Sequence, residues 1–196
     1  MSQRRRPLAA LRLVPLLVAG LAVLLPVPAA AAAGGGQGAW LPPLEVEARF
    51  VGPGTYNASA LDGSAVTYDP ASVPVGSRAT VREWANEWGG MSVRLDLEGL
   101  RPRAVYQAYL GAGRCTPQPG TLGPPFEDNP ASGVYPANEF FFATRADATG
   151  AARAVTQHYW GISTGQHARS VVVLRPGLRR AVACANVPFR RLNPGW

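Results

Sequence analysis

Few side chains in this chain of 196 residues are suited to metal binding or nucleophilic chemistry. Its imidazoles are His158 and His167, and its thiols are Cys115 and Cys184. A tetrahedral zinc site needs mostly imidazole or thiolate ligands, and a copper site needs several imidazoles. The sequence contains no Ser-His-Asp or Cys-His arrangement, no phosphate-cradling loop and no metal-spaced His/Cys cluster. Residue types and spacing therefore favour no familiar catalytic centre.

Three acids that follow the first cysteine, Glu127, Asp128 and Glu139, could form a weak cation site or a general acid–base pair. The interpretation that we favour is a solvated loop with one carboxylate on a strand face. His158 stands in an apolar, aromatic stretch, which is more typical of a surface or hydrogen-bonded core histidine than of a ligand. His167 lies in a Gly-containing turn, and we expect it to face solvent.

Positive charge is carried by arginine alone, because all 19 basic residues are Arg. The clearest basic cluster could contact an anionic cell-envelope polymer if its members gather at one end of the fold. A solubilising face is the alternative. The cluster consists of Arg175, Arg179, Arg180, Arg190 and Arg191.

Large aromatic residues also have two interpretations. They could make a binding face, or they could pack in the core, which is the use that a two-layer fold makes of such residues. We favour the core. The set is Trp84, Trp88, Phe140, Phe141, Phe142 and Trp160.

The elements that must position these side chains are predicted to be β-strands. Residues 44–50 and 91–98 alternate apolar and polar side chains, and successive side chains of a strand point to opposite faces. Many short strands without a helical period predict an all-β antiparallel sandwich or Greek-key barrel. Turn residues bound seven further segments: 65–68, 79–84, 104–110, 139–144, 151–160, 170–174 and 181–187.

The first 33 residues have the order of a secretory signal peptide: a basic start, an apolar stretch and an alanine-rich end. The apolar stretch is shorter than a spanning helix and contains Pro15, although an uncleaved anchor remains the alternative. Residues 34–43 are predicted to be a flexible Gly/Pro tether. We therefore expect a secreted or envelope-associated protein without a transmembrane domain once the signal is removed.

The net charge and the two cysteines give two further predictions. The chain carries a formal charge of +7, but after residue 33 there are 15 arginines and 12 acids, a net charge of +3. Such a small charge does not predict a nucleic-acid-binding face. In an oxidising compartment, Cys115 and Cys184 predict one disulfide, and two free thiols are the alternative.

Several motifs, in this order along the chain, resemble those of the Cu/Zn superoxide dismutases. Residues 99–102 read Gly-Leu-Arg-Pro, similar to the Gly-Leu-x-Pro turn of that family, and a strand and Cys115 follow, as its His-x-His strand and a cysteine do. The resemblance spans about 44–189 and implies an eight-stranded Greek-key β-barrel with a Cys115–Cys184 bridge. Its other landmarks are residues 123–126, 147–151, 170–174 and 183–184.

The departures from that family concern its metal ligands. The His-x-His pair falls at Tyr109 and Gly111, the metal-bridging histidine at Pro125, and a copper histidine at Leu174. These four side chains make no good ligand set, so we expect neither copper nor zinc, the cofactors that the family uses.

The sequence thus predicts a superoxide-dismutase-like pseudoenzyme: signal peptide 1–33, tether 34–43, barrel domain 44–189 and C-terminal tail 190–196. We expect no catalytic residues, no metal and no nucleic-acid partner. The expected role is a binding or structural module whose partner is an anionic envelope polymer or another envelope protein. A metalloenzyme with a rebuilt site and a general envelope protein without a specific ligand are the alternatives.

Overall fold

The computed structural model describes residues 41–60, 62–131, 137–178 and 180–192. Within these ranges the chain forms strands, turns and one short 3-10 helix, η1 (Pro119–Thr121), with no α-helix, so the all-β prediction is confirmed. The predicted signal peptide, most of the predicted tether and Arg179 lie outside the described residues. Across the same ranges, no helix has the length and apolar character needed to cross a membrane.

The described residues form nine strands, and each of the nine segments predicted from the sequence overlaps one of them. The bounds differ most at 139–144 and 151–160, where the strands are Phe141–Arg145 and Ala152–His158. The strands are β1 (Leu44–Val51), β2 (Ser64–Thr67), β3 (Arg78–Ala85), β4 (Met91–Glu98), β5 (Val105–Gly111), β6 (Phe141–Arg145), β7 (Ala152–His158), β8 (Ser170–Leu174) and β9 (Ala181–Asn186).

Alternation of side chains explains these strands. In β4, Met91, Val93 and Leu95 are buried, whereas the intervening Ser92 and Arg94 are partly exposed. A one-residue shift in register would turn the apolar set to solvent, so burial fixes the pairing of β4 with β3 and β7.

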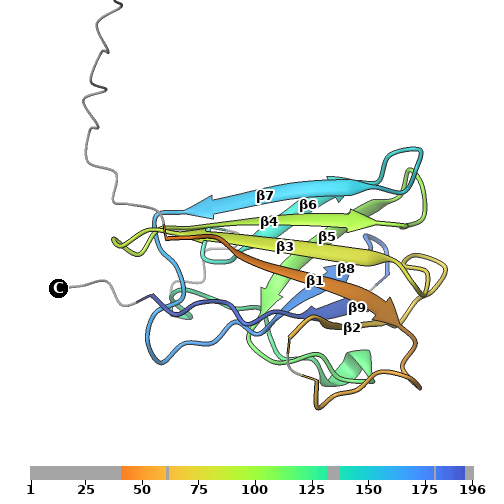
Figure 1. Ribbon diagram of the computed structural model, residues 1–196, viewed down its shortest axis with the longest axis horizontal. Helices are drawn as coiled ribbons and strands as arrows, with labels where there is room; N and C mark the ends of the chain where they lie inside the picture. Colours follow the sequence, from red (N-terminus) through yellow and green to blue (C-terminus); the bar gives the residue numbers. More distant parts are fainter. Residues whose placement is uncertain (1–40, 61, 132–136, 179, 193–196) are drawn as a thin grey trace, which may run out of the picture. The chain divides into compact units, whose positions relative to one another are not determined.

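The strands form a single sheet in the order β6-β5-β8-β9-β2-β1-β3-β4-β7. All neighbours are antiparallel except β1 and β2, which pair in parallel. The two edge strands meet through threonine side chains: Thr156 donates to the carbonyl of Phe141 at 2.6 Å and Thr144 to that of Arg153 at 2.9 Å. The sheet thereby curls into a nearly closed, barrel-like form with nine strands, against the eight that the resemblance implies (Figure 1).

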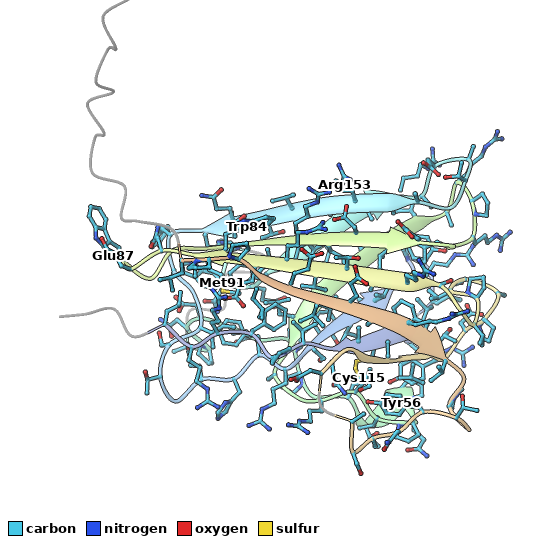
Figure 2. All side chains as sticks on the ribbon, viewed as in Figure 1. Tyr56, Trp84, Glu87, Met91, Cys115 and Arg153 are labelled. Atoms are coloured by element: carbon cyan, nitrogen blue, oxygen red, sulfur yellow. A yellow bond between two sulfur atoms is a disulfide. The ribbon has the colours of Figure 1, made fainter. Side chains whose placement is uncertain are left out.

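The apolar faces of the strands fill the barrel, and a smaller cluster packs outside it around the predicted disulfide. Cys115 and Cys184 are bonded, with Cα atoms 5.6 Å apart, which confirms that prediction. The bridge ties the loop after β5 to β9 beside Tyr56, whose hydroxyl donates to the carbonyl of Cys115 at 3.1 Å (Figure 2). This cluster fixes the loop that carries Arg114.

Candidate anion-binding cleft

Three arginines from separate parts of the chain line one cleft of about 250 Å³, here called the arginine cleft. Arg114 comes from the loop after β5, Arg169 from the segment before β8, and Arg191 from the segment after β9. Apolar side chains and polar groups complete the lining: Asp62, Ile162, His167, Ala168, Val187, Pro188 and Phe189.

Arg114 is held by anchors on both sides. The hydroxyl of Ser170 donates to the carbonyl of Gly113 at 2.8 Å. The backbone N–H of Cys115 donates to the side-chain oxygen of the buried Asn186 at 2.8 Å. Together with the disulfide, these bonds order the backbone before binding, so a ligand does not have to supply that ordering.

The other two arginines are anchored in the same way. Arg169 extends the ladder of β8, since its N–H donates to the carbonyl of Gly111 and its carbonyl accepts from the N–H of Val187. Arg191 lies between two fixed residues: the N–H of Arg190 donates to Glu83 at 3.0 Å, and the N–H of Leu192 donates to the carbonyl of Ile162 at 2.7 Å.

The charge of the cleft is not neutralised locally. Among the described residues, no carboxylate lies within ion-pair distance of these three guanidiniums, although Asp62 lines the same cleft. His167 responds to this field: partial burial and the positive charges of Arg191 and Arg169 lower its pKa below the ordinary value. Near neutral pH its imidazole is therefore neutral and can donate one hydrogen bond.

This arrangement can bind an anion. Guanidinium groups present planar pairs of N–H donors that match carboxylate and phosphate oxygens, and charge-assisted bonds of this kind are the strong ones. Apart from His167 and Asp62, the described residues that line the cleft include no nucleophile and no acid–base group.

The four positions where the resemblance places metal ligands do not fit copper or zinc. A Cβ atom added at Gly111 would lie 2.5 Å from the hydroxyl of Ser170, so a larger side chain there would displace this hydroxyl. Tyr109 and Leu174 pack against the disulfide cluster, and Pro125 pairs with Gly111 through a backbone bridge. Phenol, proline and leucine side chains do not form the imidazole-rich set that either metal requires.

The acids after the first cysteine do gather near His158. Glu127 and Glu139 pair through a backbone bridge, and burial followed by the charge of Glu127 raises the pKa of Glu139. Burial also raises the pKa of Asp128, against the pull of His158. His158 itself bonds to the carbonyl of Glu139 at 3.0 Å and stacks on Trp160. No three His, Cys, Asp or Glu side chains form a possible metal group within the described ranges.

The arginine cluster expected from the sequence divides between the two ends of β9. Arg175 lies before β9, where it donates to the hydroxyl of Ser72, and Arg180 stands immediately before the same strand. Arg190 and Arg191 follow it, beyond a six-residue strand that is about 20 Å long at 3.3 Å per residue. Of this set, only Arg191 lines the arginine cleft, and Arg179 lies outside the described residues.

The aromatic set also divides. Phe140 and Phe142 are buried in the core, whereas Trp84 and Trp160 are partly exposed. Trp88, in the turn between β3 and β4, is 62 % exposed, and Tyr159 is 90 % exposed. The core interpretation therefore holds for these two phenylalanines and in part for Trp160, which packs against the core, and it does not hold for Trp88.

Sequence reasoning missed Arg114, Arg169 and Asn186. Their spacing of 55 and 17 residues carries no periodic signal, so only the disulfide could have indicated the arrangement: Arg114 precedes Cys115, whose partner lies two residues before Asn186. The chain matches no protein-family model, no curated protein and no solved structure.

Proposed function

We propose that this chain is an exported, non-catalytic binding module of dismutase-like ancestry whose arginine cleft holds an anionic group of a cell-envelope polymer. The observation that carries the proposal is the convergence of Arg114, Arg169 and Arg191 on one cavity, with no carboxylate paired to them among the described residues. Arginines that serve only solubility do not need anchored backbone around a shared cavity.

The path of the strands supports the dismutase-like ancestry. Strands β5, β6 and β7 follow one another around the barrel, with β6 and β7 joined by the two threonine bonds. The preceding strand, β4, lies beside β7, and the following strand, β8, lies beside β5. This path agrees with the Greek-key connections that the resemblance implies, although the sheet has nine strands and not eight. The Cys115–Cys184 bridge also agrees with the resemblance.

Loss of catalysis is supported by the residues at the four ligand positions and above all by the crowding at Gly111. The purified full chain, produced with copper and zinc supplied, is expected to carry far less than one metal per chain and to have no dismutase activity. Near-stoichiometric metal together with dismutation would refute the non-catalytic part of the proposal.

Anion binding is tested by calorimetric titration of the full chain with sulfate and with polyphosphate. Replacing both Arg114 and Arg169 with glutamine should weaken binding at least tenfold, because charge-assisted hydrogen bonds each contribute about 1.5–3 kcal/mol. The matched control is Arg175→Gln with Arg180→Gln, which removes equal charge before β9 and should leave affinity within about twofold. An equal loss in both double variants would mean that net charge, and not the cleft, binds the anion.

A further inference from the structure

A second cleft, of about 200 Å³, lies next to the arginine cleft and is lined by three aromatic rings, of which two are exposed and one is partly exposed. Trp88 comes from the turn between β3 and β4, and Tyr159 and Trp160 follow β7. The turn that carries Trp88 projects beyond the end of the sheet, where Figure 2 labels the neighbouring Glu87. The rest of this aromatic cleft is uncharged and consists of Gly89, Gly161, Ser163 and Leu192.

The turn that carries Trp88 and the ring of Trp160 are held in place by contacts of two kinds, backbone hydrogen bonds and ring stacking. The side-chain oxygen of Asn86 accepts the N–H groups of Trp88 at 3.1 Å and Gly90 at 2.8 Å, which fixes the turn. Trp160 stacks on His158 with ring centroids 4.1 Å apart and meets Phe140 edge-on at 4.9 Å. Ordered aromatic rings bind with little loss of side-chain entropy, and an exposed group of them marks an interaction site.

One pair of segments separates the two clefts. Residues 161–163 and 191–192, here called the strap, are joined by a parallel bridge between Ser163 and Leu192. Ile162 and Arg191 line the arginine cleft, whereas Ser163 and Leu192 line the aromatic cleft. Because side chains alternate along extended segments, the strap presents arginine on one side and the aromatic cleft on the other. A ligand longer than one cleft can therefore contact both.

We propose that the two clefts together bind an acidic polysaccharide: one sugar lies on the aromatic rings and the acidic group of a neighbouring sugar lies among the arginines. A pyranose ring has a face of C–H groups that removes apolar surface from water when it lies on an aromatic ring. Its hydroxyls at the edge can bond to Ser163 and to the polar tips of Tyr159 and Trp160. This inference rests on the arginine cleft of the proposed function and names the class of polymer.

A single-stranded nucleic acid also combines negative charge with flat rings, but the charge distribution of the two clefts fits it less well than it fits an acidic polysaccharide. Such a strand carries a phosphate on every nucleotide and needs a basic groove along its whole path. None of the described residues that line the aromatic cleft is basic, and Glu87 stands beside Trp88. A saccharide that carries acid on some positions and neutral hydroxyls on others matches a basic cleft next to an uncharged one.

The test compares oligogalacturonate, which has acidic sugars, with polyglutamate, which has carboxylates without sugars, and with oligothymidylate. Affinities are measured by calorimetry for the full chain, for Trp88→Ala with Tyr159→Ala, and for the control Val155→Ala, an exposed apolar residue on β7. We expect oligogalacturonate to bind the wild type at least tenfold more tightly than the other two polymers. The aromatic double variant should lose at least tenfold for oligogalacturonate and keep its sulfate affinity within twofold, and Val155→Ala should change neither.

Unchanged oligogalacturonate binding in the aromatic variant would overturn the inference, as would binding of polyglutamate or oligothymidylate as tight as that of oligogalacturonate. The arginine double variant separates this failure from failure of the proposed function. If the double variant Arg114→Gln with Arg169→Gln still binds sulfate and polyphosphate more weakly than the wild type, the arginine cleft binds anions and only the sugar-binding inference fails. If the double variant binds both as tightly as the wild type, the proposed function fails as well.

Discussion

The carboxylate of Glu83 lies inside the barrel and accepts a hydrogen bond from the backbone N–H of Arg190 at 3.0 Å. Its other oxygen has no hydrogen-bond partner among the described residues. Burial raises the pKa of Glu83 from 4.5 to about 7, against the opposing pull of the Arg190 N–H and charge. An acid in the core thus holds the segment that leads to Arg191 in the arginine cleft.

Burial of Glu83 makes the free energy of unfolding depend on pH. The unfolded chain releases the Glu83 proton as the pH rises through 4.5, whereas the folded chain keeps it until about 7. The contribution of Glu83 to the free energy of unfolding is therefore fully present below pH 4.5. It falls by about 3 kcal/mol as the pH rises from 4.5 to 7. We expect Glu83→Gln to remove this pH dependence. Between pH 4.5 and 8, the free energy of unfolding of the variant should fall by about 3 kcal/mol less than that of the wild type.

Urea unfolding at a series of pH values measures the difference. The matched control is Glu87→Gln, in the exposed turn after β3, which should follow the wild-type profile. Parallel profiles for wild type and Glu83→Gln would show that Glu83 titrates as an ordinary exposed carboxyl.

Strand positions could be predicted because alternation follows directly from burial, as in β1 and β4. The same rule could not predict Glu83: alternation in β3 assigns that position to the core, where a charged residue is not expected. The extra strand β2 was identified as a strand, but its parallel pairing with β1 depends on the loop between them. Periodicity carries no information about partners, so the count and order of strands needed the structure.

The candidate site was predictable only in part. The disulfide followed from a cysteine count, and Arg191 was identified within a cluster of arginines. Arg114 and Arg169 stand alone in the sequence, and they meet Arg191 because three backbone connections converge there. Local patterns cannot show such convergence, since it depends on contacts between residues far apart in the chain.

The two histidines offer an internal comparison for anion binding. Burial lowers the pKa of His167, and the positive charges of Arg191 and Arg169 lower it further; a sulfate ion in the arginine cleft should offset these charges, so this pKa should rise on binding. By linkage, sulfate affinity should then increase as the pH falls through the interval between the free and bound pKa values. Asp62 and Arg114 also line the cleft, and sulfate itself does not titrate in this interval.

Imidazole C–H signals in NMR titrations with and without sulfate report both pKa values. His158, which is bonded to the carbonyl of Glu139 and stacked on Trp160, does not line the arginine cleft and should keep its pKa. Equal shifts of both histidines would indicate a general salt effect and contradict a specific site.

The disulfide should contribute both stability and order in the cleft. Cys115 and Cys184 are 69 residues apart, and the chain-entropy estimate for a loop of this length is about 4 kcal/mol. Reduction should lower the free energy of unfolding by about that amount and weaken sulfate binding, because Arg114 precedes Cys115. Urea unfolding and calorimetry with and without reductant measure the two effects. In the double variant Cys115→Ala with Cys184→Ala, reductant should have no effect on either quantity.

Gly111 links the missing metal site to the arginine cleft. A Cβ atom at this position would lie 2.5 Å from the hydroxyl of Ser170 and 3.2 Å from Val172, and the same hydroxyl donates to the carbonyl of Gly113 beside Arg114. Gly111→Ala should therefore destabilise the fold by about 1–3 kcal/mol through overpacking, and it should weaken sulfate binding by displacing this anchor.

The control for this substitution is Gly120→Ala, where an added Cβ atom meets open space. It should leave sulfate affinity unchanged and stabilise the fold by a few tenths of a kcal/mol, if at all, by restricting the unfolded chain. Thermal unfolding and calorimetry of both variants give the comparison. If Gly111→Ala is as stable as Gly120→Ala, the position has room for a larger side chain, and the steric argument against an imidazole ligand there fails.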